Sequence, residues 1–144
     1  MLKNPVIKGA SFQDERGSMR FINNFDMNEV VRFYEVMPKN TDLIRGWQAH
    51  KEEKKWFYCL QGSFIINLVK IDAFDNPSEA LKAVPYLISD DEPEVLYVPG
   101  GYATAIKAME KGSRIQIFSN FNLEASKNDD FRYPLTYWAA NWNI

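Results

Sequence analysis

Short apolar stretches, separated by polar turns that contain glycine or proline, run along the whole chain. From residue 56 to residue 61 the sequence Trp-Phe-Tyr-Cys-Leu-Gln alternates as a strand does, with successive side chains on opposite faces. Residues 63–71 are almost continuously apolar, which is typical of a strand buried on both faces. Similar stretches predict further strands at residues 5–8, 19–21, 29–37, 43–47, 54–61, 86–89, 94–98, 103–108 and 113–120.

The remaining segments predict one short helix and an aromatic tail. Residues 72–83 are the only segment with a helical pattern, and Asp75-Asn-Pro77 would begin that helix. Residues 123–130 are polar, and aromatic residues are frequent from Phe131 to Trp142. We expect this tail to pack on the body of the protein or on a partner subunit, because exposed apolar patches usually mark a contact.

The length and order of these elements define the fold class. The chain has 144 residues, with no internal repeat and no candidate linker, so residues 1–144 are expected to form a single domain. Many short strands with only one short helix predict an all-β barrel or jelly roll.

Composition and charge exclude several classes of partner. The net charge is −2 and no basic run is long enough for a nucleic-acid surface. The mixed run at residues 51–55, Lys-Glu-Glu-Lys-Lys, is interpreted as a solvated face. No stretch is apolar enough to cross a bilayer, and the N-terminus lacks the apolar segment of a signal peptide. Cys59 is the only cysteine and cannot form an internal disulfide, so we expect a cytoplasmic protein with Cys59 buried as a small apolar residue.

The stretch from Arg45 to Gly62 gathers the most chemistry. It contains the only histidine, His50, and leads from a compact set of polar groups into the strand described above. A small β protein can hold a ligand site at such a junction between a polar segment and a rigid strand.

Two motifs in the chain resemble those of the cupins, which are small jelly-roll barrels (double-stranded β-helices). The cupin frame of His-x-His, Glu and Gly matches Gln48-Ala-His50, Lys55 and Gly62, and the frame Pro-x-Gly-x-x-His matches residues 99–104, which end at Thr104. Of the four metal-binding positions in metallocupins, only His50 remains a usual ligand, and the ammonium of Lys55 would repel a metal. We therefore predict that no metal is bound here.

More of the chain resembles the metal-free nucleotide-sugar branch of the cupins. This branch contains dTDP-4-dehydrorhamnose 3,5-epimerases and dTDP-sugar 3,4-ketoisomerases (WxcM-like proteins). The residues that carry the resemblance are Asp14-Glu-Arg16-Gly17, Arg45-Gly-Trp-Gln48-Ala-His50-Lys, Tyr58-Cys-Leu-Gln-Gly-Ser63, Val98-Pro-Gly-Gly-Tyr-Ala103 and Asp129-Asp130 with Trp138.

The resemblance implies a set of ligand-binding residues. Arg16, Arg45 and Lys55 match basic residues that hold the nucleotide-sugar and its diphosphate in the epimerases, and fixed cations suit a diphosphate. Thr104 and Tyr97 are the other substrate-binding candidates. Each cation could instead be an ordinary surface residue.

The catalytic positions depart from the epimerase pattern. The epimerase base is replaced by Gln48, which cannot accept a proton near neutral pH, and the segment that supplies the epimerase tyrosine offers only Phe118 and Phe121. His50 matches the second histidine of the ketoisomerase motif and is the remaining candidate base. Gln48 would hold a substrate oxygen, and Tyr97 or Tyr102 would act as the acid. The alternative for His50 is a structural histidine with no catalytic role.

Three functions follow from these residues. The first is an isomerase that epimerises, or moves the ketone of, a dTDP-linked 4-keto-6-deoxyhexose without a cofactor. The second is a non-catalytic protein that binds a nucleotide-sugar or another carbohydrate. The third is a generic ligand-binding cupin. Its pocket would stack on a base or sugar and could be lined by Trp47, Trp56, Phe64 and Tyr102, although such aromatic side chains could equally belong to the core. The resemblance also implies a homodimer that exchanges an N-terminal strand.

Overall fold

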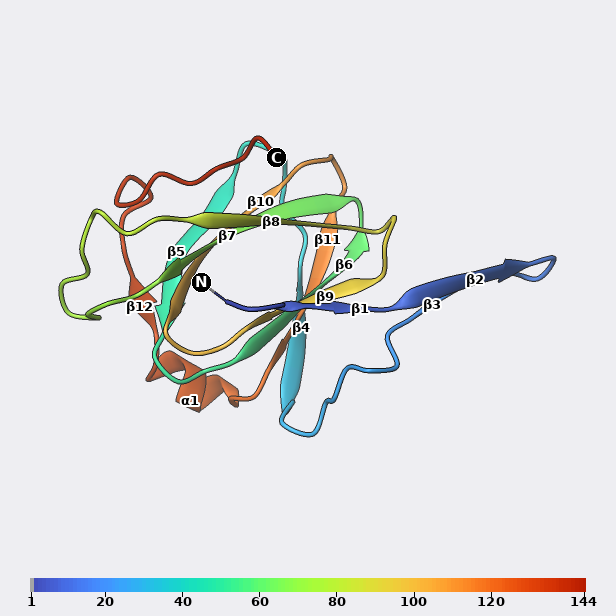
Figure 1. Cartoon of the computed structure of the whole chain (residues 1–144), viewed down its shortest axis with the longest axis horizontal. Helices are drawn as coiled ribbons and strands as arrows, with labels where there is room; N and C mark the ends of the chain where they lie inside the picture. Colours follow the sequence, from blue (N-terminus) through green and yellow to red (C-terminus); the bar gives the residue numbers. More distant parts are fainter. Residues whose placement is uncertain (1) are drawn as a thin grey trace.

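The computed structural model describes residues 2–144 and contains two five-stranded antiparallel sheets that face each other (Figure 1). The first sheet has the order β1-β9-β6-β11-β4 and the second has the order β12-β5-β10-β7-β8. The strands are β1 Val6–Lys8, β2 Ala10–Asp14, β3 Gly17–Phe21, β4 Arg32–Val36, β5 Ile44–His50, β6 Lys55–Gln61, β7 Ser63–Lys70, β8 Val84–Ser89, β9 Glu94–Val98, β10 Tyr102–Ala108, β11 Arg114–Ser119 and β12 Phe131–Arg132. This arrangement confirms the predicted all-β jelly-roll barrel.

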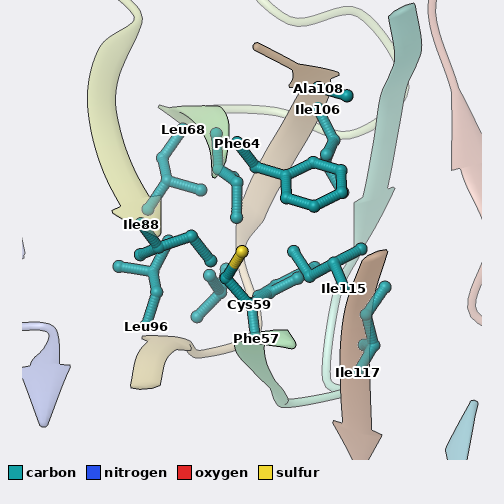
Figure 2. Close-up of a cluster of buried hydrophobic side chains, with 12 residues drawn as sticks. Phe57, Cys59, Phe64, Leu68, Ile88, Leu96, Ile106, Ala108, Ile115 and Ile117 are labelled. Carbon is teal, nitrogen blue, oxygen red and sulfur yellow. The ribbon is translucent and has the colours of Figure 1, made fainter. Parts of the chain in front are cut away.

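The space between the sheets is filled by apolar side chains from both of them, which we call the inner cluster. Phe57, Cys59, Leu96, Val98, Ile115 and Ile117 come from the first sheet, and Phe64, Ile66, Leu68, Ile88, Ile106 and Ala108 from the second. Figure 2 shows Phe57 and Cys59 surrounded by these residues. The alternation predicted for residues 56–61 is confirmed, because Trp56 and Tyr58 lie outside the inner cluster.

The predicted strands are present, and the structure adds two that the sequence pattern did not reveal, β12 in the tail and β2 near the N-terminus. β2 pairs with β3 in a separate two-stranded hairpin that projects from the barrel (Figure 1). The residues of β2 are mostly exposed on both faces. They therefore lack the alternation between apolar and polar positions that identifies a half-buried strand.

The predicted helix at residues 72–83 is wrong. This segment contains bends and turns, and the one helix described is α1, Leu123–Lys127, which lies in the polar part of the tail. The Asp72 side chain accepts the backbone N–H groups of Ala73 and Ser78, and the carbonyl of Ser78 accepts Trp138 Nε1–H at 2.9 Å. Side chains therefore bind backbone groups that a helix would have paired internally.

The aromatic tail packs on the body, as expected. Its side chains join the outer cluster, which covers the outer face of the second sheet and contains Trp47, Ala49, Val69, Ile71, Ala103, Ala105 and Trp138. Trp138 is 2% exposed and its ring meets that of Trp47 edge-on at 5.5 Å between centroids. The hydroxyl of Tyr133 donates to the carbonyl of Phe74 at 2.8 Å. The tail therefore holds the 72–83 loop against the barrel.

The described part of the chain contains no helix of the length and apolarity that a membrane crossing requires.

Replacing Trp138 with alanine should lower the free energy of unfolding by about 3–5 kcal/mol, because it removes a fully buried indole and its hydrogen bond to the loop. Urea unfolding followed by far-UV circular dichroism measures this loss. Leu135→Ala, at a position that is 48% exposed, is the control and should change the value by less than about 0.5 kcal/mol. A loss below about 1 kcal/mol for Trp138→Ala would mean that the tail contributes little to stability.

Candidate functional site

His50 is the last residue of β5, at one end of the barrel. Along β5, Trp47 and Ala49 belong to the outer cluster, so the side chains of Gln48 and His50 face the other side of the sheet. His50 is 7% exposed and is paired across the ladder with Tyr102 of β10.

The turn that follows His50 is fixed by a carboxylate from the C-terminal segment. Asp129 accepts the backbone N–H groups of Lys51 at 2.7 Å, Glu52 at 2.9 Å and Glu53 at 2.8 Å. On the other side, a Cβ at Gly100 would lie 2.5 Å from the carbonyl oxygen of Lys51, so only glycine allows the two backbones to approach this closely. Residues 51–53 are therefore held from two directions.

Glu53 is buried next to His50. The interpretation of residues 51–55 as a solvated face is therefore wrong at Glu53, and it is wrong at Lys55 too, which is also buried. The side chain of Glu53 is 1% exposed. One carboxylate oxygen accepts a hydrogen bond from Ser126 at 2.7 Å, and the other accepts one from Ser119 and lies 3.4 Å from Arg32 Nη2. These donors offset the cost of burying a charge. Sequence reasoning missed Glu53, and its spacing of three residues from His50 was the available signal.

The same network fixes the protonation of the His50 ring. Nδ1 lies 2.6 Å from the carbonyl oxygen of Asp129 and 3.3 Å from Oε1 of Glu53. Both neighbours are acceptors, so Nδ1 carries the proton in the neutral ring and Nε2 holds a free lone pair. Nε2 is buried and has no hydrogen-bond partner within residues 2–144. An unpaired buried acceptor is costly, and a ligand proton would satisfy it.

Nε2 belongs to a side chain that lines a narrow cavity at the end of the barrel. The cavity volume is about 10 Å³, roughly the space of one water molecule. Its polar lining residues are His50, Glu53, Lys55, Tyr102 and Thr104. Four of the residues singled out from the sequence therefore meet here.

The other four candidates lie elsewhere. Gln48 donates to Oδ1 of Asp130 at 3.0 Å and does not line the cavity. Tyr97 lies outside the inner cluster and stacks on Trp56 with 5.3 Å between centroids. Arg45, near the other end of β5, is exposed, and Arg16 lies in the turn of the β2–β3 hairpin, where it pairs with Asp14 at 2.7 Å.

The aromatic residues proposed for a stacking pocket are mostly structural. Trp47 belongs to the outer cluster and Phe64 to the inner cluster. Trp56 lies outside the inner cluster and stacks on Tyr97. Tyr102 alone among them lines the His50 cavity.

The environment of His50 favours the neutral ring. Burial lowers the pKa of His50, and the positive charge of Lys55 lowers it further. The hydrogen bond to the carbonyl of Asp129 and the negative charge of Glu53 act in the opposite direction without reversing the shift. His50 is therefore an unprotonated imidazole at neutral pH, the form in which a general base acts.

The donor set at the cupin motif does not fit a metal. Gln48, Lys55 and Thr104 occupy three of the four metallocupin positions, and the ammonium of Lys55 lines the same cavity as His50. Within residues 2–144, no group of three or more His, Cys, Asp or Glu side chains is placed to hold a metal ion. The metal-free site stays a prediction.

Cys59 contributes no reactive group to the site. It belongs to the inner cluster and is 1% exposed. Burial raises the pKa of its thiol to about 12, so the thiolate is not populated near neutral pH.

The titration of His50 tests this arrangement, and as the only histidine its ring proton gives a unique NMR signal. We expect a midpoint below about 6.5, and a still lower midpoint in Glu53→Gln, because the substitution removes a negative charge 3.3 Å from Nδ1. The matched control is Glu52→Gln at the exposed neighbouring position, which should leave the midpoint unchanged.

The lowered pKa of His50 also determines how the free energy of unfolding depends on pH. The unfolded chain binds a proton on His50 more readily than the folded protein does, so stability is fully present above about pH 6.5 and decreases as the pH falls towards the folded-state pKa. A midpoint at or above the unfolded value, or stability that rises on acidification through this range in wild type relative to His50→Asn, would contradict the assignment.

Solved structures of similar shape share one enzyme class in their descriptions. QdtA, a 3,4-ketoisomerase from Thermoanaerobacterium thermosaccharolyticum solved with TDP, aligns with a TM-score of 0.71 and 22% identity over 95% of this chain and 93% of that chain. WlaRB, a TDP-quinovose 3,4-ketoisomerase from Campylobacter jejuni, has a TM-score of 0.65 and 18% identity over 89% and 91% of the two chains. The dTDP-4-dehydrorhamnose 3,5-epimerase from Elizabethkingia anophelis has a TM-score of 0.72 and 17% identity over 96% and 80%. These similarities show the cupin fold.

The sequence itself identifies the family. No curated protein sequence matches the chain. Residues 3–134 match the family described as WxcM-like, C-terminal (FdtA), which confirms the resemblance found in the motifs. The chain therefore belongs to the WxcM-like, C-terminal (FdtA) family.

Proposed function

We propose that the protein is an isomerase that removes a proton next to the ketone of a dTDP-linked 4-keto-6-deoxyhexose. The observation that carries this proposal is the buried, unpaired Nε2 of His50, which belongs to a neutral imidazole lining a cavity beside Lys55. The family supports the substrate class, since the structural neighbours are described as ketoisomerases and epimerases of nucleotide-linked sugars.

A neutral imidazole and an ammonium group that line one cavity suit an enolate mechanism. His50 Nε2 takes the proton from the carbon next to the ketone, and the electrons of that C–H bond move to the carbonyl oxygen. Lys55 is 8% exposed, and its ammonium would stabilise the oxyanion in a poorly solvated site. Protonation of the same carbon from the opposite face gives an epimer. Protonation of the former carbonyl carbon, together with transfer of the proton from the neighbouring hydroxyl group to the former carbonyl oxygen, moves the ketone.

Two hydroxyl groups in the cavity, and two residues that orient the imidazole, complete the proposed site. Thr104 and Tyr102 line the cavity and can hydrogen-bond substrate oxygens, and burial raises the pKa of Tyr102, so its hydroxyl stays a donor. Glu53 and Asp129 do not touch the substrate in this scheme. They hold the imidazole so that Nε2 faces the cavity.

The alternative is a protein that binds a nucleotide-sugar or another carbohydrate without reaction. Gln48 occupies the position of the epimerase base, and its amide is engaged by Asp130. Phe121 stands in place of the epimerase tyrosine, and a phenyl ring has no proton to give. Phe118, in the same segment, packs its ring against Phe33 and Phe25. These substitutions remove an acid–base pair of the epimerase type, so all proton transfer would depend on His50.

His50→Asn separates the two functions. The expected result is that exchange of solvent deuterium into a dTDP-4-keto-6-deoxyhexose falls by about 100-fold or more, while dTDP affinity stays within about threefold of wild type. Mass spectrometry of the sugar and calorimetric titration measure the two quantities. Deuterium exchange that persists in His50→Asn would show that His50 is not the base. Binding of dTDP by wild type without any exchange would favour the non-catalytic alternative.

We also propose a homodimer, in which the projecting hairpin packs on a second copy of the chain. Phe12 and Met19 are directly paired across the hairpin and are 55% and 61% exposed, and a two-stranded hairpin is only marginally stable by itself. Phe33, on the edge strand β4, is 66% exposed and offers an apolar surface of the same kind. A role for Arg16 in ligand binding then depends on the partner, because this hairpin projects from its own barrel (Figure 1).

Sedimentation velocity tests the dimer. Wild type should sediment with twice the chain mass, and Phe12→Asp should shift the population towards monomer, because it places a charge in the apolar contact. Leu123→Asp, at a position 58% exposed on α1, is the control and should leave the dimer intact. A monomeric wild type at tens of micromolar would overturn this proposal.

A further inference from the structure

A second and larger cavity lies beside that of His50. Its volume is about 230 Å³, and its polar lining residues are Lys70, Lys82, Tyr86 and Tyr102. Tyr102 lines both cavities, so both lie against this side chain. The His50 cavity is too narrow for a sugar, whereas the larger one has room for a ligand that reaches His50 past Tyr102.

The strand register places Lys70 in line with His50. Tyr102 of β10 is paired with His50 of β5 on one side and with Lys70 of β7 on the other. Directly paired residues point to the same face of a sheet, so the three side chains form one row across three neighbouring strands. Strands lie roughly 5 Å apart, which puts His50 and Lys70 about 10 Å apart at the backbone.

Lys82 lines the same cavity and lies in the loop just before β8, the strand that pairs with β7. The β7–β8 ladder ends at the pair Leu68 and Val84, and two more residues in the same register would bring Lys70 opposite Lys82. Leu81 and Ala83 pack against the outer cluster, and Lys82 between them lines the cavity. The tail therefore sets the direction of Lys82 by holding the loop that precedes β8.

Lys70 and Lys82 are exposed side chains that line the same cavity, and two positive charges with no anion between them repel each other. Neither Lys70 nor Lys82 forms a salt bridge with the described residues 2–144. An anion bound between them would remove the repulsion, and the tyrosine hydroxyls of the same cavity can donate further hydrogen bonds to it.

We propose that Lys70 and Lys82 hold the diphosphate of the nucleotide-sugar while its keto-sugar reaches His50. The inference rests on the proposed function and adds to it a phosphate subsite formed by this chain's own residues. In a nucleotide-sugar the diphosphate is linked to the carbon on one side of the sugar ring and the ketone lies across the ring. The row from Lys70 through Tyr102 to His50 matches that order. Arg16 and Arg45 line neither cavity.

Calorimetric titration of the full chain with dTDP, inorganic pyrophosphate and thymidine tests the subsite. Lys70→Ala and Lys82→Ala should each weaken dTDP binding by about tenfold, because each removes a charge-assisted contact to phosphate. Thymidine binding should not change. The control variant is Lys111→Ala, in the exposed turn between β10 and β11, and circular dichroism verifies that every variant is folded.

The outcomes distinguish the subsite from the proposed function. Wild-type affinity for dTDP in both lysine variants overturns the subsite and leaves the nucleotide-sugar function in place. Lysine-dependent binding of pyrophosphate without any binding of dTDP supports the anion subsite and overturns the nucleotide part of the proposed function. A wild-type protein that binds neither dTDP nor pyrophosphate overturns both.

Discussion

The carboxylate of Asp129 is the contact on which the geometry of the site depends. It accepts three consecutive backbone N–H groups of residues 51–53, and the carbonyl of the same residue faces Nδ1 of His50. A carboxylate with three backbone donors is a strong and directional anchor. It ties the C-terminal segment to the turn between β5 and β6, two parts of the chain that are far apart in sequence. The orientation of the only histidine therefore depends on contacts made by the tail.

Burial strengthens the electrostatic interactions in the site and also costs free energy, because polar groups lose their contacts with water. Glu53 is enclosed by serine hydroxyls, Arg32 and the His50 ring, and the buried Lys55 lines the same cavity. Charges interact more strongly where water is excluded, so Glu53 and Lys55 act on the imidazole with opposite signs at short range. The balance leaves a neutral ring with an unpaired acceptor, an arrangement that a purely structural histidine would not need.

This end of the barrel also contains two cavities of very different volume. Around His50 the walls are close and leave about 10 Å³, while the neighbouring space beside Lys70 and Lys82 has about 230 Å³. The narrow part leaves space for about one water molecule beside the imidazole, and the wide part has room for the bulk of a ligand. The tail contributes to both parts, since it anchors the turn after His50 and holds the loop that carries Lys82.

Hydrophobic periodicity in the sequence was sufficient to predict most strands and the jelly-roll class, because a strand with one face in the barrel must alternate and a central strand must be apolar throughout. Motif spacing was sufficient to select the family and to single out His50, Lys55, Tyr102 and Thr104, which the structure brings together. The helix at 72–83 was mispredicted, since its carbonyls are bound by tail residues about sixty positions away. Tertiary structure alone decided three other features. These are the burial of Glu53 within a charged run, the position of Tyr97 on the outer face and the pair of lysines beside Tyr102. Each of them depends on which distant strands become neighbours and in what register, and local sequence does not encode that pairing.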